Sequence, residues 1–107
     1  MDEVVWKILS TVAKRGYMGA SREDLFKEAR GINYDELRQI IEDLEREGHL
    51  TLEWLGMNKF IATITPGGSA LVRSEYVKRI EDFRKRADTE ESTRSDEGPS
   101  GDTAKGN

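Results

Sequence analysis

The feature that most constrains the fold is the stretch Gly31–Leu50, GINYDELRQIIEDLEREGHL, which reads as a capped amphipathic helix followed directly by a strand. Asn33 is placed as an N-cap, and Glu36 three residues later completes a capping box. The apolar residues recur at steps of three and four and therefore share one face: Leu37, Ile40, Ile41 and Leu44. Gly48 predicts the end of the helix. Residues 49–54 then alternate at period two, which indicates a strand.

Two further helices are predicted before this stretch. The first runs from about Asp2 to Arg15, and the second is a short helix over Arg22–Arg30 with Ser21 as its cap and Asp24 as the partner in a capping box. The segment Tyr17–Ala20 is too short for a helix, so we expect a brief extended segment that pairs with a later hairpin. The loop from Gly31 to Asn33 is short, as a helix-turn-helix requires.

A hairpin and a long helix follow. Two strands are predicted, Leu50–Trp54 and Phe60–Ile64, with Gly56–Lys59 as the turn. One side of each strand is apolar: Leu50, Leu52 and Trp54 on the first, and Phe60, Ala62 and Ile64 on the second. Thr65 and Pro66 form a strong start signal for a last helix that reaches Ala87. From Ser69 this helix would be about 30 Å long at 1.5 Å per residue. That is longer than a small core needs.

This order of elements resembles the winged-helix family over residues 4–87. Three stretches carry the resemblance: SREDL at 21–25, LEREGHL at 44–50 and ITPGGSAL at 64–71. The chain is similar to small prokaryotic regulators of the MarR and PadR type, and to small archaeal DNA-binding winged helices whose last helix pairs with its copy in an antiparallel coiled coil. The resemblance implies an α+β, mostly α fold: a winged helix-turn-helix with a three-helix core, a two-stranded wing and a long C-terminal helix.

Charge and composition divide the chain into a winged-helix domain (residues 1–68), a C-terminal helix (69–87) and an acidic tail (88–107). Of the 107 residues, the tail holds the whole formal net charge of −4, and residues 1–87 balance at 15 basic and 15 acidic side chains. The tail has no large apolar residue and is predicted to be disordered. It either competes with nucleic acid or engages a basic partner, or it is a solvating extension.

Composition also weighs against several classes of function. There is no cysteine and one histidine, His49, so we predict no metal site, no cofactor and no enzyme activity. Neither a signal peptide nor a membrane-spanning apolar run is found, and we therefore expect a cytoplasmic protein with no membrane partner.

The resemblance implies that the third helix enters the major groove of double-stranded DNA. The candidate DNA-binding residues are Arg22, Lys27, Tyr34, Arg38, Gln39 and Lys59. Arg38 is a candidate for a guanine or a phosphate, Gln39 for an adenine and Tyr34 for a phosphate. The third helix also carries six acids against two arginines, which is unfavourable for neutralising phosphates.

The last helix suggests a homodimer through residues 70–87. Its apolar positions step by four, four and three, and they are Val72, Tyr76, Ile80 and Phe83. The alternative is a monomer whose last helix folds against the first helix near Trp6.

From the resemblance and these residues together, we predict a DNA-binding transcriptional regulator. The alternative function is a protein-interaction module in a transcription or chromosome-associated complex, which the acidic third helix and the large apolar residues Trp6, Trp54, Met57 and Phe60 favour.

Overall fold

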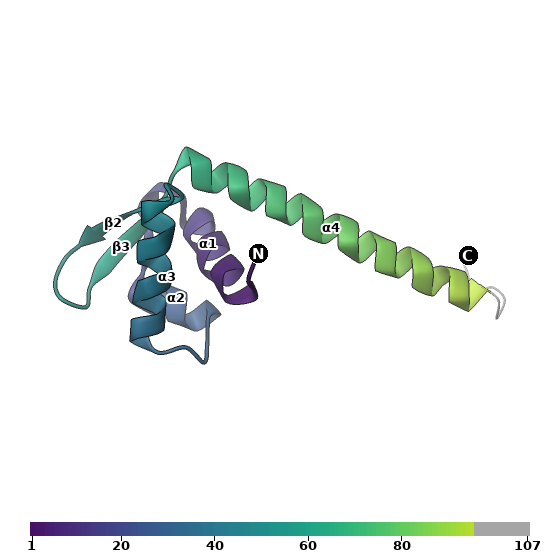
Figure 1. The fold of residues 1–107 in the computed structure, drawn as a ribbon, viewed down its shortest axis with the longest axis horizontal. Coiled ribbons are helices and arrows are strands. Elements are labelled where there is room, and N and C mark those ends of the chain that lie inside the picture. Colours follow the sequence, from purple (N-terminus) through teal and green to yellow (C-terminus); the bar gives the residue numbers. More distant parts are fainter. Residues whose placement is uncertain (96–107) are drawn as a thin grey trace. The chain divides into compact units, whose positions relative to one another are not determined.

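The computed structural model describes residues 1–95, and it describes side chains up to Ala87. The elements are α1 (Glu3–Arg15), the 3-10 helix η1 (Gly16–Met18), β1 (Ala20–Ser21), α2 (Arg22–Glu28), α3 (Tyr34–Arg46), β2 (Leu50–Trp54), β3 (Phe60–Ile64) and α4 (Pro66–Ser95) (Figure 1). The chain divides into two compact units, one covering Met1–Glu75 and one beginning at Tyr76. The predicted α+β, mostly helical architecture is confirmed.

The segment after α1 differs in part from the prediction of an extended stretch over Tyr17–Ala20. Gly16–Met18 form a 3-10 turn, and only Ala20–Ser21 is a strand. This strand pairs with β3 as expected, with Ala20 opposite Ala62. Gly19 lies between the 3-10 turn and the strand, and it has a φ of 79°, a backbone conformation that glycine adopts readily. A side chain at Gly19 would also collide with that of Ile61.

Both predicted capping boxes are confirmed. At the start of α2, the Ser21 hydroxyl accepts from the Asp24 N–H (3.2 Å), and the Asp24 carboxylate accepts from the Ser21 N–H (3.0 Å). At the start of α3, Asn33 and Glu36 exchange the same pair of bonds, at 2.8 and 2.9 Å. Each box satisfies two N–H groups that the helix leaves unpaired.

α2 is shorter than predicted, and α3 ends as predicted. α2 stops at Glu28 rather than Arg30, because the backbone of Ala29 leaves the helical range and its side chain enters the core. At the end of α3, Gly48 has a φ of 85° and donates to the Glu45 carbonyl (2.9 Å). His49 donates to the Leu44 carbonyl (2.9 Å). These two bonds form a Schellman motif, which turns the chain into β2.

The three strands form an antiparallel sheet in the order β1-β3-β2. In the β2–β3 hairpin, Leu50 lies opposite Ile64 and Trp54 opposite Phe60. Because opposite residues share a face, the predicted apolar sides of the two strands coincide. The core lies between this face and the first three helices, and its fully or nearly buried members are Ile8, Leu9, Val12, Ala20, Leu25, Ala29, Leu37, Ile41, Leu44, Leu50, Phe60 and Ala62.

α4 starts as predicted and extends further than predicted. The Thr65 hydroxyl oxygen accepts from the Gly68 N–H (3.0 Å), which caps the helix, and Leu71 and Val72 pack against the core. The first compact unit therefore reaches Glu75, beyond the boundary expected at Gly68. The helix continues past Ala87 to Ser95, since no glycine or proline interrupts the sequence there. The rest of the predicted acidic tail, residues 96–107, lies outside the described residues.

Candidate nucleic-acid interface

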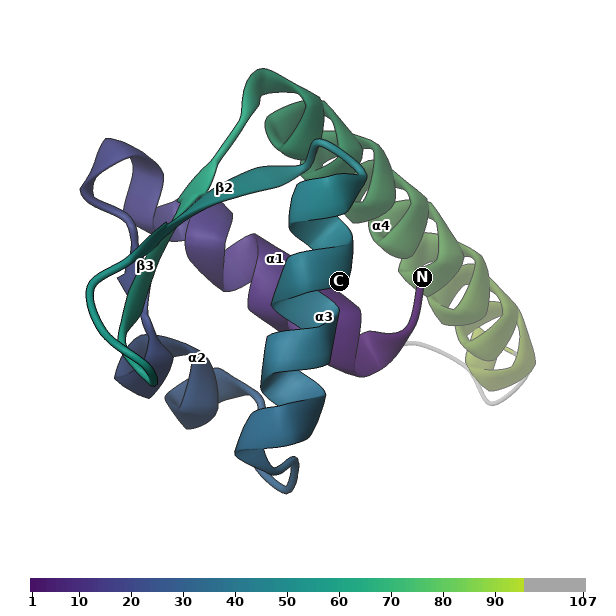
Figure 2. The ribbon, with the colours of Figure 1, turned by 60° about the vertical axis from the view of Figure 1, so that its left-hand side comes forward.

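α3 has a buried face and an outward face. Its buried side chains are Leu37, Ile41 and Leu44, while Asp35, Arg38 and Gln39 are exposed. Seen in Figure 2, α3 lies beside the hairpin and α2 lies near the N-terminal half of α3. Residues from three elements can therefore meet along the outward face of α3.

Arg38 is held between α3 and the hairpin. Its Nε donates to the Glu42 carboxylate at 3.0 Å, one helical turn further along. Its guanidinium carbon lies 5.1 Å from the centroid of the Trp54 ring, in a cation–π contact. The hydrogen bond to Glu42 raises the pKa of Arg38 above its ordinary value. Arg38 therefore remains charged, and its position is set by two contacts.

Gln39 and Arg46 share one acceptor. The Gln39 side-chain amide donates to Asp43 Oδ1 at 3.0 Å, and Arg46 Nη1 donates to the same oxygen at 2.6 Å. The bond from Arg46 holds the pKa of Asp43 below its usual range. Each of these polar side chains is thus already engaged within α3. A DNA contact by Gln39 would exchange one of these bonds for a base edge.

Arg22 and Tyr34 connect α2 to the N-terminal turn of α3. The guanidinium carbon of Arg22 lies 5.7 Å from the Tyr34 ring centroid, and its Nη2 donates to Glu23 at 3.3 Å. The Tyr34 hydroxyl oxygen is buried and has no hydrogen-bond partner within the described residues. A phosphate contact by Tyr34, as predicted, would require this hydroxyl to move into solvent.

The hairpin turn adds a third cation. Lys59 and Arg22 line one concave surface of about 200 Å³, together with Leu55 and Phe60. Within residues 1–95 Lys59 makes no ion pair. Lys27 is placed differently, because five helical positions put it roughly 140° around α2 from Arg22.

The predicted candidates therefore separate into two groups. Arg22 contacts Tyr34 and shares a concave surface with Lys59, while Arg38 contacts Trp54. Tyr34 and Arg38 are four residues apart and therefore neighbours on one face of α3, so we name these five residues the α3–wing cluster. Lys27 faces elsewhere, and Gln39 lies along a different side of α3. An exposed ion pair such as Arg38–Glu42 contributes little to stability, so phosphates or base edges can compete with it.

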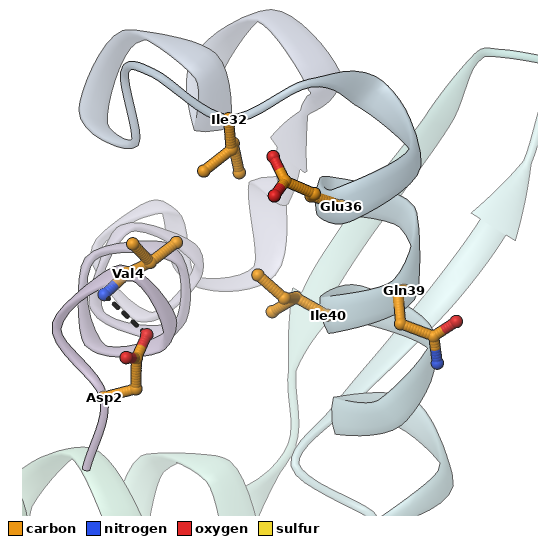
Figure 3. Close-up of a pocket in the computed structure, with 6 residues that line it drawn as sticks. All are labelled: Asp2, Val4, Ile32, Glu36, Gln39 and Ile40. Atoms are coloured by element: carbon orange, nitrogen blue, oxygen red, sulfur yellow. Dashed lines mark hydrogen bonds between the residues drawn. The ribbon is translucent and has the colours of Figure 1, made fainter.

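A second concave surface lies beside Gln39. It is an open cleft of about 360 Å³ lined by Asp2, Val4, Ile32, Glu36, Gln39 and Ile40. Figure 3 shows Val4, Ile32 and Ile40 pointing into the same space, with the carboxylates of Asp2 and Glu36 at its edge. Both carboxylates already accept backbone N–H groups as helix caps. No pattern in the sequence predicted this cleft.

Within residues 1–95, no group of three or more His, Cys, Asp and Glu side chains is arranged to hold a metal ion. No helix over the same residues has the length and apolar content needed to cross a bilayer.

A helix-turn-helix followed by a two-stranded wing defines a winged helix, and this chain has that fold. Two solved structures are similar to it. BpsR from Bordetella bronchiseptica, whose DNA binding is regulated by 6-hydroxynicotinic acid, is 22% identical with a TM-score of 0.57 over 82% of this chain and 76% of BpsR. The DNA-binding protein Sso10a-2 from Sulfolobus solfataricus is 18% identical with a TM-score of 0.56 over 92% of this chain and 96% of its own.

At these identities the likeness establishes the fold. No family model and no curated protein matches the sequence. The predicted resemblance to winged helices is confirmed at this level.

Trp54 is the member of the cluster that sequence reasoning missed. Its alternation with Leu50 and Leu52 indicated a core residue, yet 38% of its surface is exposed. The spacing of Arg38 and Glu42 does signal their pairing, because residues four apart are neighbours on a helix. No comparable sequence signal links Arg38 to Trp54, which is on another element.

Proposed function

We propose that this chain binds double-stranded DNA through the α3–wing cluster and acts as a transcriptional regulator. The observation that carries the proposal is the grouping of Arg22, Arg38 and Lys59, which come from α2, α3 and the hairpin turn. A helix flanked by cations on two neighbouring elements suits a duplex groove bordered by phosphates. The two similar structures are of DNA-binding proteins, which supports the same assignment.

Electrostatics limit the strength of this binding. Acidic residues outnumber basic ones in residues 1–75, and the cations of α3 are paired within the helix. Nonspecific affinity comes mainly from phosphate neutralisation. With Arg22 and Lys59 as phosphate contacts, the logarithm of the association constant for DNA should fall with the logarithm of the salt concentration, with a slope of about −2 per chain. This is a weak, moderately salt-dependent interaction.

A homodimer through α4 is the second part of the proposal. Tyr76 and Phe83 are 58% and 66% exposed. Their separation of seven residues places them on one face, with Ile80 near them. Val72, the fourth predicted dimer residue, packs against the core of its own chain. A dimer would double the phosphate contacts and set the distance between two half-sites.

The second candidate function is a protein-interaction module. The hairpin turn exposes Leu55 by 58% and Met57 by 88%. Large exposed apolar side chains at a loop tip often mark a protein contact. Met57→Ser should weaken such a protein contact with little change in DNA affinity, because Met57 lies outside the α3–wing cluster.

The test of DNA binding is a titration of the full chain on random duplex at several salt concentrations. Arg22→Ala and Lys59→Ala should each weaken binding to all sequences alike and reduce the salt slope by about 1. Lys14→Ala is the matched control, because Lys14 lies in the last turn of α1, outside the cluster. Absence of binding at low salt would overturn the proposal and favour the protein-interaction module.

A further inference from the structure

We infer that Arg38 recognises a guanine base rather than a phosphate, and that Trp54 is the residue that positions it. This inference rests on the proposed DNA binding and adds to it a base and a positioning residue. Three features of the Arg38 environment carry it: which nitrogen is occupied, how the charge is balanced, and what holds the side chain in place.

The first feature is the choice of nitrogen. Arg38 donates to Glu42 through Nε, at 3.0 Å. The guanidinium has five N–H donors, and those on its two terminal nitrogens have no hydrogen-bond acceptor among the described residues. Two parallel N–H groups match the O6 and N7 acceptors of guanine in the major groove. Arg22 differs, because its bond to Glu23 uses the terminal nitrogen Nη2.

The second feature is the balanced charge. Glu42 offsets part of the attraction of Arg38 for a phosphate, since the two groups form an ion pair at 3.0 Å. A phosphate contact gains its free energy by replacing condensed counterions with net positive charge. A base contact depends on donor geometry instead. Lys59, which makes no ion pair within the described residues, fits the phosphate role better.

The third feature is the support beneath Arg38. The guanidinium carbon of Arg38 lies 5.1 Å from the centroid of the Trp54 ring. The Trp54 ring in turn packs edge to face against the Phe60 ring, with the two centroids 5.4 Å apart. Phe60 is 2% exposed and belongs to the core. A chain of contacts thus fixes the arginine to the core, so less side-chain freedom is lost when it binds a base.

The experiment uses the full chain and begins with selection of preferred duplexes from a random library. Every base pair of the selected site is then varied in competition titrations. The chain should prefer a G·C pair at one position of each half-site by roughly 5- to 150-fold. Replacing that guanine with 7-deazaguanine, which lacks the N7 acceptor, should remove much of the preference.

The decisive variant is Arg38→Lys, which keeps the charge and removes the fork of donors. It should lose the preference at that position, become insensitive to 7-deazaguanine and bind random duplex within about twofold of the original chain. Lys59→Ala is the contrasting control, with uniformly weaker binding and an unchanged preference.

The role of Trp54 is tested by rescue. Trp54→Leu should reduce the guanine preference, whereas Trp54→Phe should keep most of it, since a phenyl ring still offers a face to the cation. Thermal melting checks that Trp54→Leu folds. Glu42→Gln, which removes the charge and keeps the size of the side chain, independently tests the charge balance and should strengthen binding to random duplex and steepen its salt slope.

The outcomes separate this inference from the proposed function. Salt-dependent DNA binding in which Arg38→Lys keeps its preference at every position would overturn the role of Arg38 and leave DNA binding intact. Equal guanine preference in Trp54→Leu and the original chain would overturn the positioning role. If the full chain binds no duplex, the proposed function fails and this inference fails with it.

Discussion

At the scale of single residues, Gly68 has the least room for a side chain among the glycines of the described residues. A Cβ there would overlap the carbonyl oxygen of His49, and Ile64 lies close on the other side. The neighbouring Gly67 is different, because its nearest atom, the Gly48 carbonyl oxygen, would be 3.4 Å away. The contact at Gly68 lets the start of α4 approach the turn after α3.

These two glycines give a matched pair of substitutions. Gly68→Ala should lower the free energy of unfolding by about 1–3 kcal/mol, because backbone must move to relieve the overlap. Gly67→Ala should change it little or raise it by up to about 1 kcal/mol, since alanine favours a helix. Urea unfolding measures both. Equal destabilisation by the two substitutions would contradict the close approach at Gly68.

Asp24 gives the fold a pH dependence. The backbone N–H of Ser21 donates to its carboxylate and holds the pKa of Asp24 below its ordinary value. A lowered folded-state pKa contributes stability above the ordinary pKa of about 3.9, and that contribution is lost as pH falls through the folded-state value.

Asp24→Ala should therefore lower the free energy of unfolding by about 1 kcal/mol at neutral pH, the typical net contribution of one hydrogen bond. The difference from the original chain should shrink below about pH 4. Denaturant unfolding at a series of pH values measures it, with Glu28→Ala on the same helix as the control. A difference that stays constant into acid would rule out the carboxylate as its source.

At the scale of elements, what could be predicted from sequence was local. The caps of α2 and α3 depend on side chains three residues apart, and the Schellman turn depends on Gly48. Such signals lie within a few residues of the structure they specify. The early end of α2 could not be predicted in this way, because it reflects packing of Ala29 into a core built from distant parts of the chain.

The candidate site shows the same limit. Exposed cations on α2, α3 and the turn were identifiable from helical phase and hairpin pattern. Their grouping depends on contacts between elements, such as Arg22 with Tyr34 and Arg38 with Trp54. Burial of the Tyr34 hydroxyl likewise follows from tertiary packing. No spacing rule in the sequence contains this information.

The proposed dimer is tested at the level of α4. Ile80→Glu combined with Phe83→Glu should give monomers in sedimentation, because two charges would be buried in the apolar contact. Lys78→Glu combined with Arg84→Glu is the control, since both positions are already charged and exposed, and it should leave the mass unchanged. A mass unaffected by the first pair would reject the α4 interface.

At the scale of the whole molecule, charge is separated along the sequence. Residues 88–107 carry a net charge of −4, whereas residues 1–87 are neutral. A negative segment attached to a DNA-binding fold should compete with DNA for its cations. A chain ending at Ala87 should therefore bind random duplex more tightly than the full chain at low salt.

Salt distinguishes this competition from other effects of truncation. The difference between the two chains should diminish as the salt concentration rises, because screening weakens interactions between exposed charges. Titrations of both chains over the same salt series measure it. A difference independent of salt, or weaker binding by the shorter chain, would contradict competition by the acidic segment.

The most direct measurement of the central claim is an NMR map of backbone amide shifts in the full chain with and without a saturating short duplex. DNA binding through the α3–wing cluster predicts the largest changes at residues 21–22, 34, 38, 42 and 54–60, with α1 and the cleft beside Val4 little affected. Changes confined to α1 or to the cleft beside Val4 would place the interface elsewhere. An unchanged spectrum at low salt would contradict DNA binding by this chain.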